Sequence, residues 1–276
     1  MAILLSLLAA ASYGLADFSG GFASKRASAW SVALVACLTG GVLVLALSAV
    51  SGGEPTTSDL WWGAAAGVGN GFGTAFLYRG LSSGRMGVVA PVSGVGAAVI
   101  PVVVGVALGE RPAALVWLGI VLALPAIWLV ARDPAGLSSA APGGVADGSL
   151  AGLGFGLFFV ALGQVSDDAG MLPLAVNQLV AGVVIVLVAL TLRQPWLPRE
   201  RAALGGILAG ALGTCAAVLF VAATHHGYLS VAAVLTSLYP AFTVVLAASV
   251  LREHVHRAQA AGLLLCAVAV SLVAAG

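Results

Sequence analysis

Long intervals without charge divide this chain, and they constrain its fold more than any other feature. The 11 Lys and Arg and 10 Asp and Glu residues fall in short clusters, and several intervals between the clusters are long enough for a membrane-spanning helix, which needs roughly 20 residues. Charged residues make up only 8% of the chain and hydrophobic ones 61%, whereas about a quarter of a soluble domain is charged. We therefore exclude a soluble fold and predict an all-α membrane protein.

The charge-free intervals predict ten transmembrane helices. Their expected bounds are 2–22, 30–50, 60–79, 86–108, 113–131, 149–165, 172–192, 202–223, 227–251 and 258–275. All formal charges but one then lie in connections or at the ends of spans. The exception is Asp17, in the stretch YGLADFSGGFASKR that begins at Tyr13.

A shift of 143 residues places the second half of the chain on the first without gaps. Residues 84–110 then lie over 227–253, so that Glu110 falls on Glu253 and Ser93 falls on Thr236. We read this as an internal repeat. Its expected parts are a first five-helix repeat over 1–131, a linker rich in Pro, Gly and Ser over 132–148, and a second five-helix repeat over 149–276.

An odd number of helices in each repeat predicts that the second repeat enters the membrane from the opposite side, as in inverted-repeat transporters. The charges agree with this, because the first connection holds Lys25 and Arg26 whereas its repeat mate holds Asp167 and Asp168. Only Arg111, of the 11 Lys and Arg residues, falls in an even-numbered connection. By the positive-inside rule, both termini are expected outside the cytoplasm.

The two halves share a pattern: a short turn, a helix of small residues with an internal proline, then an acidic residue and a new helix. It reads GRMGVVAPVSGVGAAVIPVVVGVALGERPAALVWLG over 84–119 and GYLSVAAVLTSLYPAFTVVLAASVLREHVHRAQAAG over 227–262. In this pattern the chain resembles the ten-helix, EamA-like branch of the drug/metabolite transporter superfamily. The resemblance covers essentially the whole chain and implies a multi-pass protein of the bacterial plasma (inner) membrane. It also implies cytoplasmic termini, against the charge count.

The resemblance implies a central cleft lined by helices 1, 3, 4, 6, 8 and 9, with helices 5 and 10 as buttresses. The candidate substrate-binding or coupling residues are polar or aromatic, and most lie inside these spans. They are Tyr13, Asp17, Asn70, Arg79, Ser93, Gln164, Thr236, Ser237 and Tyr239. The alternative for each hydroxyl is a hydrogen bond between packed helices.

Asp17 is the sharpest of these candidates, because an ionisable group inside a membrane span is costly and points to function. Its repeat mate is Val160, so the repeat itself does not require a carboxylate at this position. We expect Asp17 to face the cleft, where it binds a cationic group or exchanges a proton. The alternatives are an ion pair with Arg79, which ends helix 3 on the same side of the membrane, or snorkelling of the carboxylate to the membrane interface.

Together these features predict a secondary transporter that moves a small metabolite, such as an amino acid, an amine or a similar amphipathic solute, by alternating access. The expected partners are this solute, the lipid bilayer and protons as coupling ion, in a monomer or homodimer. No nucleic acid, cofactor, metal ion or catalytic residue is expected. Two alternatives stay open: an integral membrane enzyme acting on lipid-linked substrates, for which the charges offer no catalytic cluster, and a membrane scaffold that transports nothing.

Overall fold

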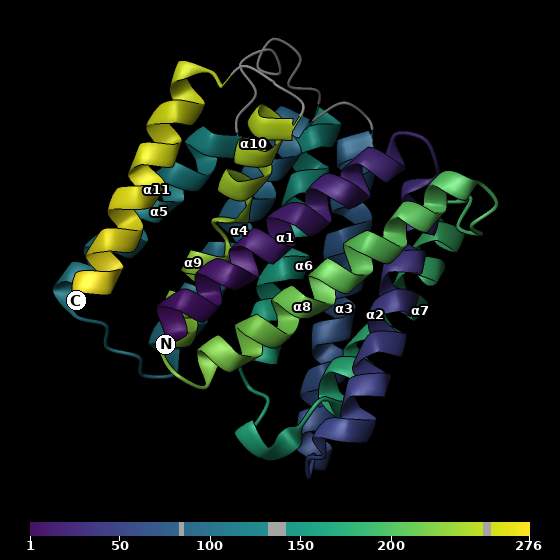
Figure 1. The fold of residues 1–276 in the computed structure, drawn as a ribbon, viewed down its shortest axis with the longest axis horizontal. Coiled ribbons are helices and arrows are strands. Elements are labelled where there is room, and N and C mark those ends of the chain that lie inside the picture. Colours follow the sequence, from purple (N-terminus) through teal and green to yellow (C-terminus); the bar gives the residue numbers. More distant parts are fainter. Residues whose placement is uncertain (83–85, 132–141, 251–254) are drawn as a thin grey trace.

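A computed structural model describes residues 1–82, 86–131, 142–250 and 255–276, and all regular structure in these residues is helical. A helix, or in one case a pair of helices, lies over each of the ten predicted spans (Figure 1). The elements are α1 (Ala2–Ser24), α2 (Ala29–Ser51), α3 (Thr57–Ser82), α4 (Met86–Ala107), α5 (Ala114–Ala131), α6 (Pro142–Leu162), η2 (Asp167–Ala169), α7 (Leu172–Thr191), η3 (Arg201–Leu204), α8 (Gly205–Thr224), α9 (Leu229–Thr236), α10 (Tyr239–Val250) and α11 (Arg257–Ala275).

Several of these helices are long and apolar enough to cross a membrane. In the described part of the chain, seven segments meet this criterion: 2–24, 29–51, 144–162, 172–191, 201–224, 229–246 and 257–275. Shorter apolar stretches lie in α4 and α5, at 92–107 and 114–130. The predicted all-helical, multi-pass membrane protein is therefore confirmed at this level.

The second half of the chain begins its first helix earlier than predicted. α6 starts at Pro142 rather than at 149, so residues 142–148 of the expected linker are helical. Proline suits a helix start, because the first turn needs no N–H from it. Residues 132–141 of the expected linker lie outside the described residues.

The predicted span 227–251 is divided, because α9 ends at Thr236 and α10 begins at Tyr239. Pro240 explains this break, since proline gives no backbone N–H to the preceding turn and its ring crowds that turn. The turn tightens instead, with the Leu238 N–H donating to the Leu235 carbonyl at 3.2 Å. The equivalent helix of the first half, α4, runs on without a break.

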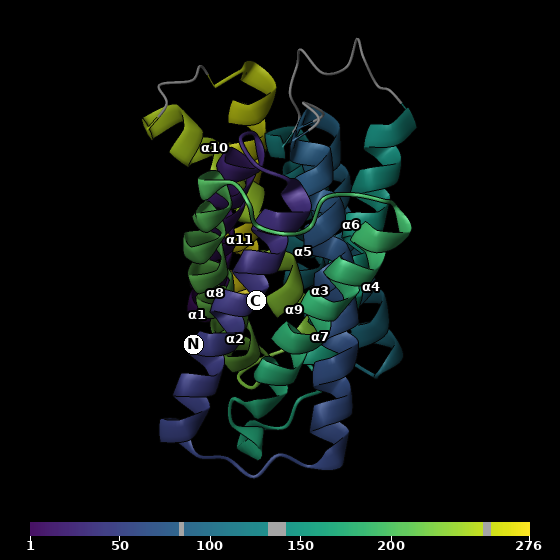
Figure 2. The same ribbon diagram turned by 90° about the vertical axis from the view of Figure 1, so that its right-hand side faces the viewer.

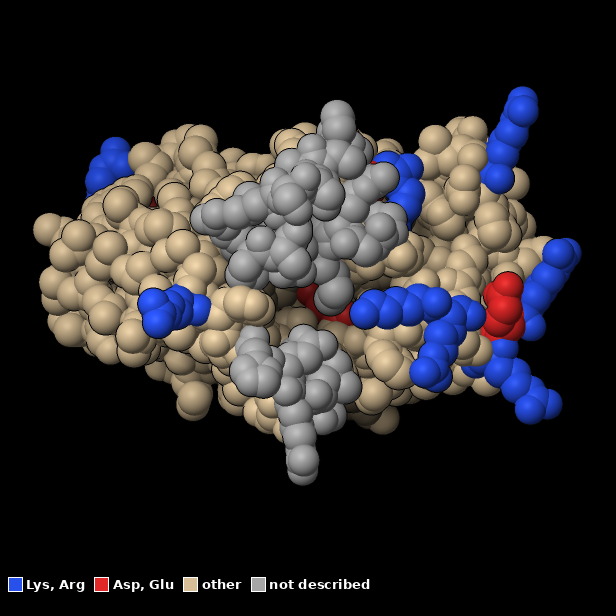
Figure 3. Space-filling view, turned by 90° about the horizontal axis from the view of Figure 1, so that it is seen from above, with Lys and Arg blue, Asp and Glu red and all other residues tan. Residues whose placement is uncertain are grey.

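The helices form one bundle with its connections at two ends. Both termini lie at the lower end in Figure 1, together with the α2–α3, α6–α7 and α8–α9 connections, while the α1–α2 and α7–α8 connections lie at the upper end. α1 therefore runs toward the upper end and α6 runs away from it. Figure 3 looks onto the upper end and shows many Lys and Arg side chains but few Asp and Glu.

Glycines bring α3 close to two helices of the second half, α6 and α7 (Figure 2). A Cβ atom on Gly69 would lie 2.5 Å from the Gly154 carbonyl oxygen, and one on Gly154 would lie 2.5 Å from the Gly73 nitrogen. On the α7 side, a Cβ atom on Gly67 would lie 2.6 Å from the Asn177 carbonyl oxygen. Small residues at such crossings let membrane helices pack backbone to backbone. Asn70 lies among these glycines of α3, and its side chain points toward α7.

Candidate functional site

A cavity between the helices holds about 680 Å³ of space free of protein atoms, including the part that opens to the outside. The lining side chains come from α1, α2, α3, α6, α7, α8 and the first residue of α10. They are Tyr13, Ala16, Asp17, Ala36, Cys37, Asn70, Thr74, Tyr78, Phe155, Phe158, Phe159, Asn177, Gln178, Ala209, Gly210, Gly213, Thr214, Ala217 and Tyr239.

The structure brings four of the nine candidate residues together around this cavity: Tyr13, Asp17, Asn70 and Tyr239. The other five candidates are not in its lining; they are Arg79, Ser93, Gln164, Thr236 and Ser237. The helices also differ from those that the resemblance implied. None of the described residues of α4 lines the cavity, whereas α2 and α7 contribute to it; the ninth predicted helix, 227–251, contributes Tyr239 from α10.

The face of α1 toward the cavity explains the sequence around Asp17. Tyr13 and Asp17 are four residues apart and so lie on one face of the helix. Gly20 continues this face, where a Cβ atom would collide with the Tyr78 ring. Gly14 lets α10 approach, because a Cβ atom there would lie 2.8 Å from the Tyr239 carbonyl oxygen. The two glycines thus allow tyrosines of α3 and α10 to pack close to Asp17.

Asp17 has no hydrogen bond or ion pair within the part of the chain that the structure describes, and its side chain is partly exposed to the cavity. The expected alternative, a pair with Arg79, is not formed. Arg79 instead donates through Nε to Asp147 Oδ1 at 3.0 Å, and Asp147 is a buried residue of α6. The Arg79 guanidinium also lies 4.5 Å from the centre of the Phe76 ring. The carboxylate in the cavity is therefore left available to a ligand or a proton.

A relay of amides and hydroxyls crosses the cavity wall from α3 to α8. Asn70 donates to the side-chain oxygens of Asn177 and Gln178, both at 3.3 Å. Gln178 donates to Thr214 Oγ1 at 3.0 Å, and the Thr74 hydroxyl donates to Asn70 Oδ1 at 3.1 Å. Asn177 and Gln178 were missed by the sequence reasoning, although two adjacent amides in an otherwise apolar span were a usable signal.

Aromatic rings form much of the remaining wall. Tyr13 meets Phe159 edge-on at 6.0 Å between ring centres and Tyr239 at 6.5 Å. The Tyr13 hydroxyl is buried and has no hydrogen-bond partner in the described structure. Such a hydroxyl costs free energy unless a partner satisfies it, so a bound solute or water is the expected partner.

The hydroxyl candidates outside the cavity surround the break between α9 and α10. Ser93 lies 3.4 Å from the Tyr239 hydroxyl, and Thr236 donates to the Ser6 carbonyl in α1 at 3.4 Å. Both are fully buried, as is Ser237. The alternative reading, hydrogen bonds between packed helices, thus describes Ser93 and Thr236. Gln164 lies just after the end of α6, in the connection to α7, where its N–H donates to the Ala161 carbonyl.

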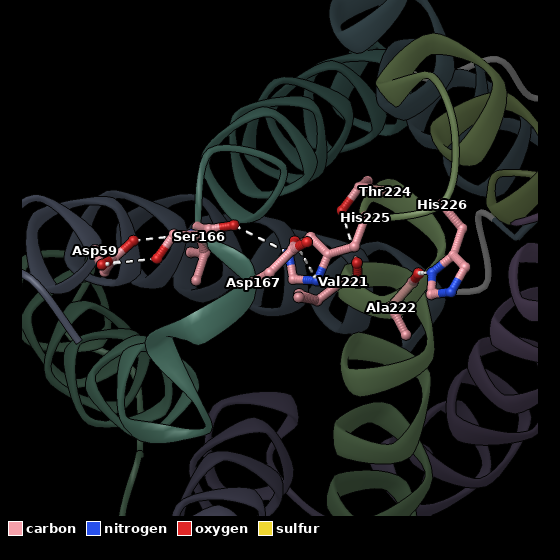
Figure 4. A network of polar contacts seen from close by, with 9 residues as sticks. Asp59, Ser166, Asp167, Val221, Ala222, Thr224, His225 and His226 are labelled. Atoms are coloured by element: carbon pink, nitrogen blue, oxygen red, sulfur yellow. Dashed lines mark hydrogen bonds and ion pairs between the residues drawn. The ribbon is translucent and has the colours of Figure 1, made fainter. Parts of the chain in front are cut away.

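Polar contacts tie together the connections at this lower end (Figure 4). Asp59, in the first turn of α3, accepts hydrogen bonds from the Ser166 backbone N–H at 2.8 Å and the Ser166 hydroxyl at 3.1 Å. The Glu54 N–H donates to the Asp168 carbonyl at 2.8 Å. The α2–α3 connection of the first half is therefore bound to the segment that follows α6.

The turn between α8 and α9 joins the same network. The His225 ring lies with Nδ1 at 3.0 Å from Asp167 Oδ1 and Nε2 at 3.0 Å from the Val165 carbonyl oxygen (Figure 4). Glu110 caps α9 from the α4–α5 connection, accepting the Leu229 and Ser230 N–H groups at 2.5 and 3.1 Å. These contacts link the connections at the lower end of the bundle to one another.

The model of the EamA-like transporter family matches residues 1–132 and 144–275. A solved crystal structure of a protein has the same fold, with a TM-score of 0.73 and 18% sequence identity over 98% of this chain and 95% of its own. No curated protein matches the sequence.

Proposed function

This chain belongs to the EamA-like transporter family, and we propose that it is a secondary transporter for a small metabolite, an amino acid, an amine or a similar amphipathic solute, in the bacterial plasma membrane. The observation that carries this proposal is the central cavity, in which Asp17 presents a carboxylate without a protein partner among the described residues. A membrane-embedded cavity with an ionisable group is suited to binding a solute and coupling it to an ion, and protons are the coupling ion that a lone carboxylate favours.

The proposed architecture is a pair of inverted five-helix repeats with ten membrane crossings. In it, α9 and α10 together make one crossing, which is consistent with the single apolar segment over 229–246. The opposite directions of α1 and α6 (Figure 1) support the inversion. So do the two separate matches of the family model, one to each half.

Alternating access then requires the two ends of the bundle to open in turn. The lower end is held by Asp59 with Ser166 and by Glu110 with the start of α9, all contacts between the two halves of the chain. We propose that these contacts part when the cavity faces the lower side. At the upper end, Arg79 of α3 and Asp147 of α6 join the same two halves.

Solute flux into vesicles that contain the purified chain tests this function. We expect a solute that raises the melting temperature of the protein, as a ligand that binds only the folded state must, also to cross the membrane and to exchange with unlabelled solute inside. Vesicles that pass no solute would favour a scaffold. Hydrolysis or modification of a lipid-linked substrate would favour the enzyme alternative.

Cys37 offers a second readout, because it lines the cavity but is buried, so that its labelling reports opening of the cavity to the reagent. In a variant that lacks Cys215 and Cys266, a water-soluble maleimide should label Cys37 faster from the upper side than from the lower side. The solute that is transported should change this ratio. Equal labelling from both sides would indicate a fixed pore.

Orientation is a separate prediction. Ten of the 11 Lys and Arg residues belong to odd-numbered connections, so the upper end is expected to face the cytoplasm and both termini to lie outside. A reporter that is active only in the cytoplasm, fused after Gly276, should stay inactive, whereas the same reporter inserted at Gln194 in the α7–α8 connection should be active. The reverse pattern would restore the topology that the family resemblance implies.

A further inference from the structure

The described cavity lining carries a negative charge and no positive charge. Asp17 is its only charged residue, and no Lys, Arg or His belongs to the lining that the described residues form. The one basic residue among the sequence candidates, Arg79, is held by Asp147 and does not line the cavity. A buried charge is costly unless an opposite charge compensates it. The cavity is therefore suited to a ligand that carries a positive charge and no negative one.

The aromatic wall favours the same ligand. Three tyrosines and three phenylalanines line the cavity with Asp17: Tyr13, Tyr78, Tyr239, Phe155, Phe158 and Phe159. Aromatic faces attract cations, and ammonium groups are recognised in cages of such rings. The rings also supply apolar surface for a hydrocarbon body attached to the cation.

A carboxylate on the ligand would meet no positive charge in the described lining, only neutral donors such as the Tyr13 hydroxyl and the Asn177 amide. The amides of Asn70 and Gln178 direct N–H groups at protein oxygens and carry no net charge. The start of α10 reaches the cavity at Tyr239, and the broken ends of membrane helices can bind anions. Here, however, Pro240 lacks an N–H and the Ala241 N–H donates to the Leu238 carbonyl at 2.9 Å. Gly14 of α1 packs directly on this turn, where an added Cβ atom would lie 2.8 Å from the Tyr239 carbonyl oxygen.

We propose that the cavity selects amines that carry one positive charge and no carboxylate, and rejects the zwitterionic amino acids from which such amines differ by a carboxyl group. The inference rests on the proposed transport function and narrows its substrate class. The ammonium group lies against Asp17 among the tyrosine rings, and the apolar body lies along the phenylalanines of α6.

Matched sets of solutes test the selection at pH 7, where a primary amine is cationic. Each set contains an amine, its parent amino acid and a neutral alcohol of the same shape: phenethylamine, phenylalanine and 2-phenylethanol; tyramine, tyrosine and 4-hydroxyphenylethanol; isopentylamine, leucine and isopentyl alcohol. Dissociation constants are measured on the purified full chain in detergent. We expect at least one amine to bind about ten-fold or more tightly than both of its partners, a difference of about 1.4 kcal/mol.

Three variants tie this selectivity to the carboxylate. Asp17→Asn should lose most of the affinity for the amine, Asp17→Glu should keep part of it, and Asp168→Asn, which removes an exposed carboxylate outside the cavity, should bind like the wild type. Melting temperatures check that each variant is folded. Equal affinity for amine and amino acid, an Asp17→Asn variant that binds the amine like the wild type, or no amine binding at all would overturn the inference.

Binding and transport are measured separately, so the two proposals can fail separately. An amine that binds as expected but crosses no vesicle would remove the transport function and leave the ligand class standing. Vesicles that move amino acids in preference to amines would keep the transport function and overturn the ligand class.

Discussion

Replacement of Asp17 by asparagine is expected to lower the transport rate about 30-fold or more while the melting temperature stays the same or rises. Removing one charge of a desolvated pair costs about 2–5 kcal/mol, and each 1.4 kcal/mol changes a rate about ten-fold. The stability should not fall, because Asp17 makes no hydrogen bond or ion pair in the described structure. An isosteric amide instead removes the cost of holding an unpaired carboxylate between helices.

Loss of function without loss of stability separates a functional carboxylate from a structural one. Transport is measured in vesicles that contain equal amounts of the folded wild type and variant, and melting temperatures are measured in detergent. Asp168→Asn serves as the control for loss of an acidic group. A variant that transports at the wild-type rate, or one that melts several degrees lower, would show that Asp17 acts as an anchor between helices.

The helices could be located from the sequence because charge is nearly excluded from a bilayer. Among the predicted helix starts, that of α6 differs most from the structure. The prediction ended the linker only after Asp147, because this residue is charged. In the structure Asp147 is inside the helix and compensated by Arg79. The prediction thus treated Asp147 as a helix boundary, because the local sequence does not reveal a partner that lies 68 residues away.

The cavity lining was harder to predict, for a related reason. In a soluble protein an apolar stripe shows which side of a helix is buried, but a membrane helix is apolar all round, so its sequence does not show which side faces lipid. Asp17 and Asn70 could be found because they are polar in apolar spans. Asn177 and Gln178 carried the same signal but lie in α7, a helix that the resemblance did not place at the cleft. Tyr78 was not singled out either.

The second large effect is expected at Asp59, where replacement by alanine should lower the free energy of unfolding by about 3 kcal/mol, since hydrogen bonds to charged groups contribute about 1.5–3 kcal/mol each. Asp59 is 3% exposed and accepts four hydrogen bonds, from the N–H and hydroxyl groups of Thr56 and Ser166. Asp59 precedes Trp61 in α3, and the Trp61 side chain is exposed. Tryptophans are enriched where a helix meets the membrane surface. Asp59 is therefore placed in the polar layer outside the bilayer core.

The dependence of this effect on pH identifies the carboxylate as its source. Burial raises the pKa of Asp59, but the hydrogen bonds from Thr56 and Ser166 outweigh burial and hold this pKa at about 2. Because the pKa is lower in the folded than in the unfolded protein, the stabilisation is present above the unfolded value of about 4 and is lost as the pH falls toward 2. As the pH falls through this window, the melting temperature of the wild type should decrease more than that of Asp59→Asn. Ser166→Ala removes one of the four hydrogen bonds, so its melting temperature at neutral pH should lie between those of the wild type and Asp59→Asn. Because Asp59 and Ser166 join the two halves at the lower end, and we propose that this contact parts when the cavity faces that side, Asp59→Ala should also label faster at Cys37 from the lower side. A variant that melts and labels like the wild type would show that other contacts close this end.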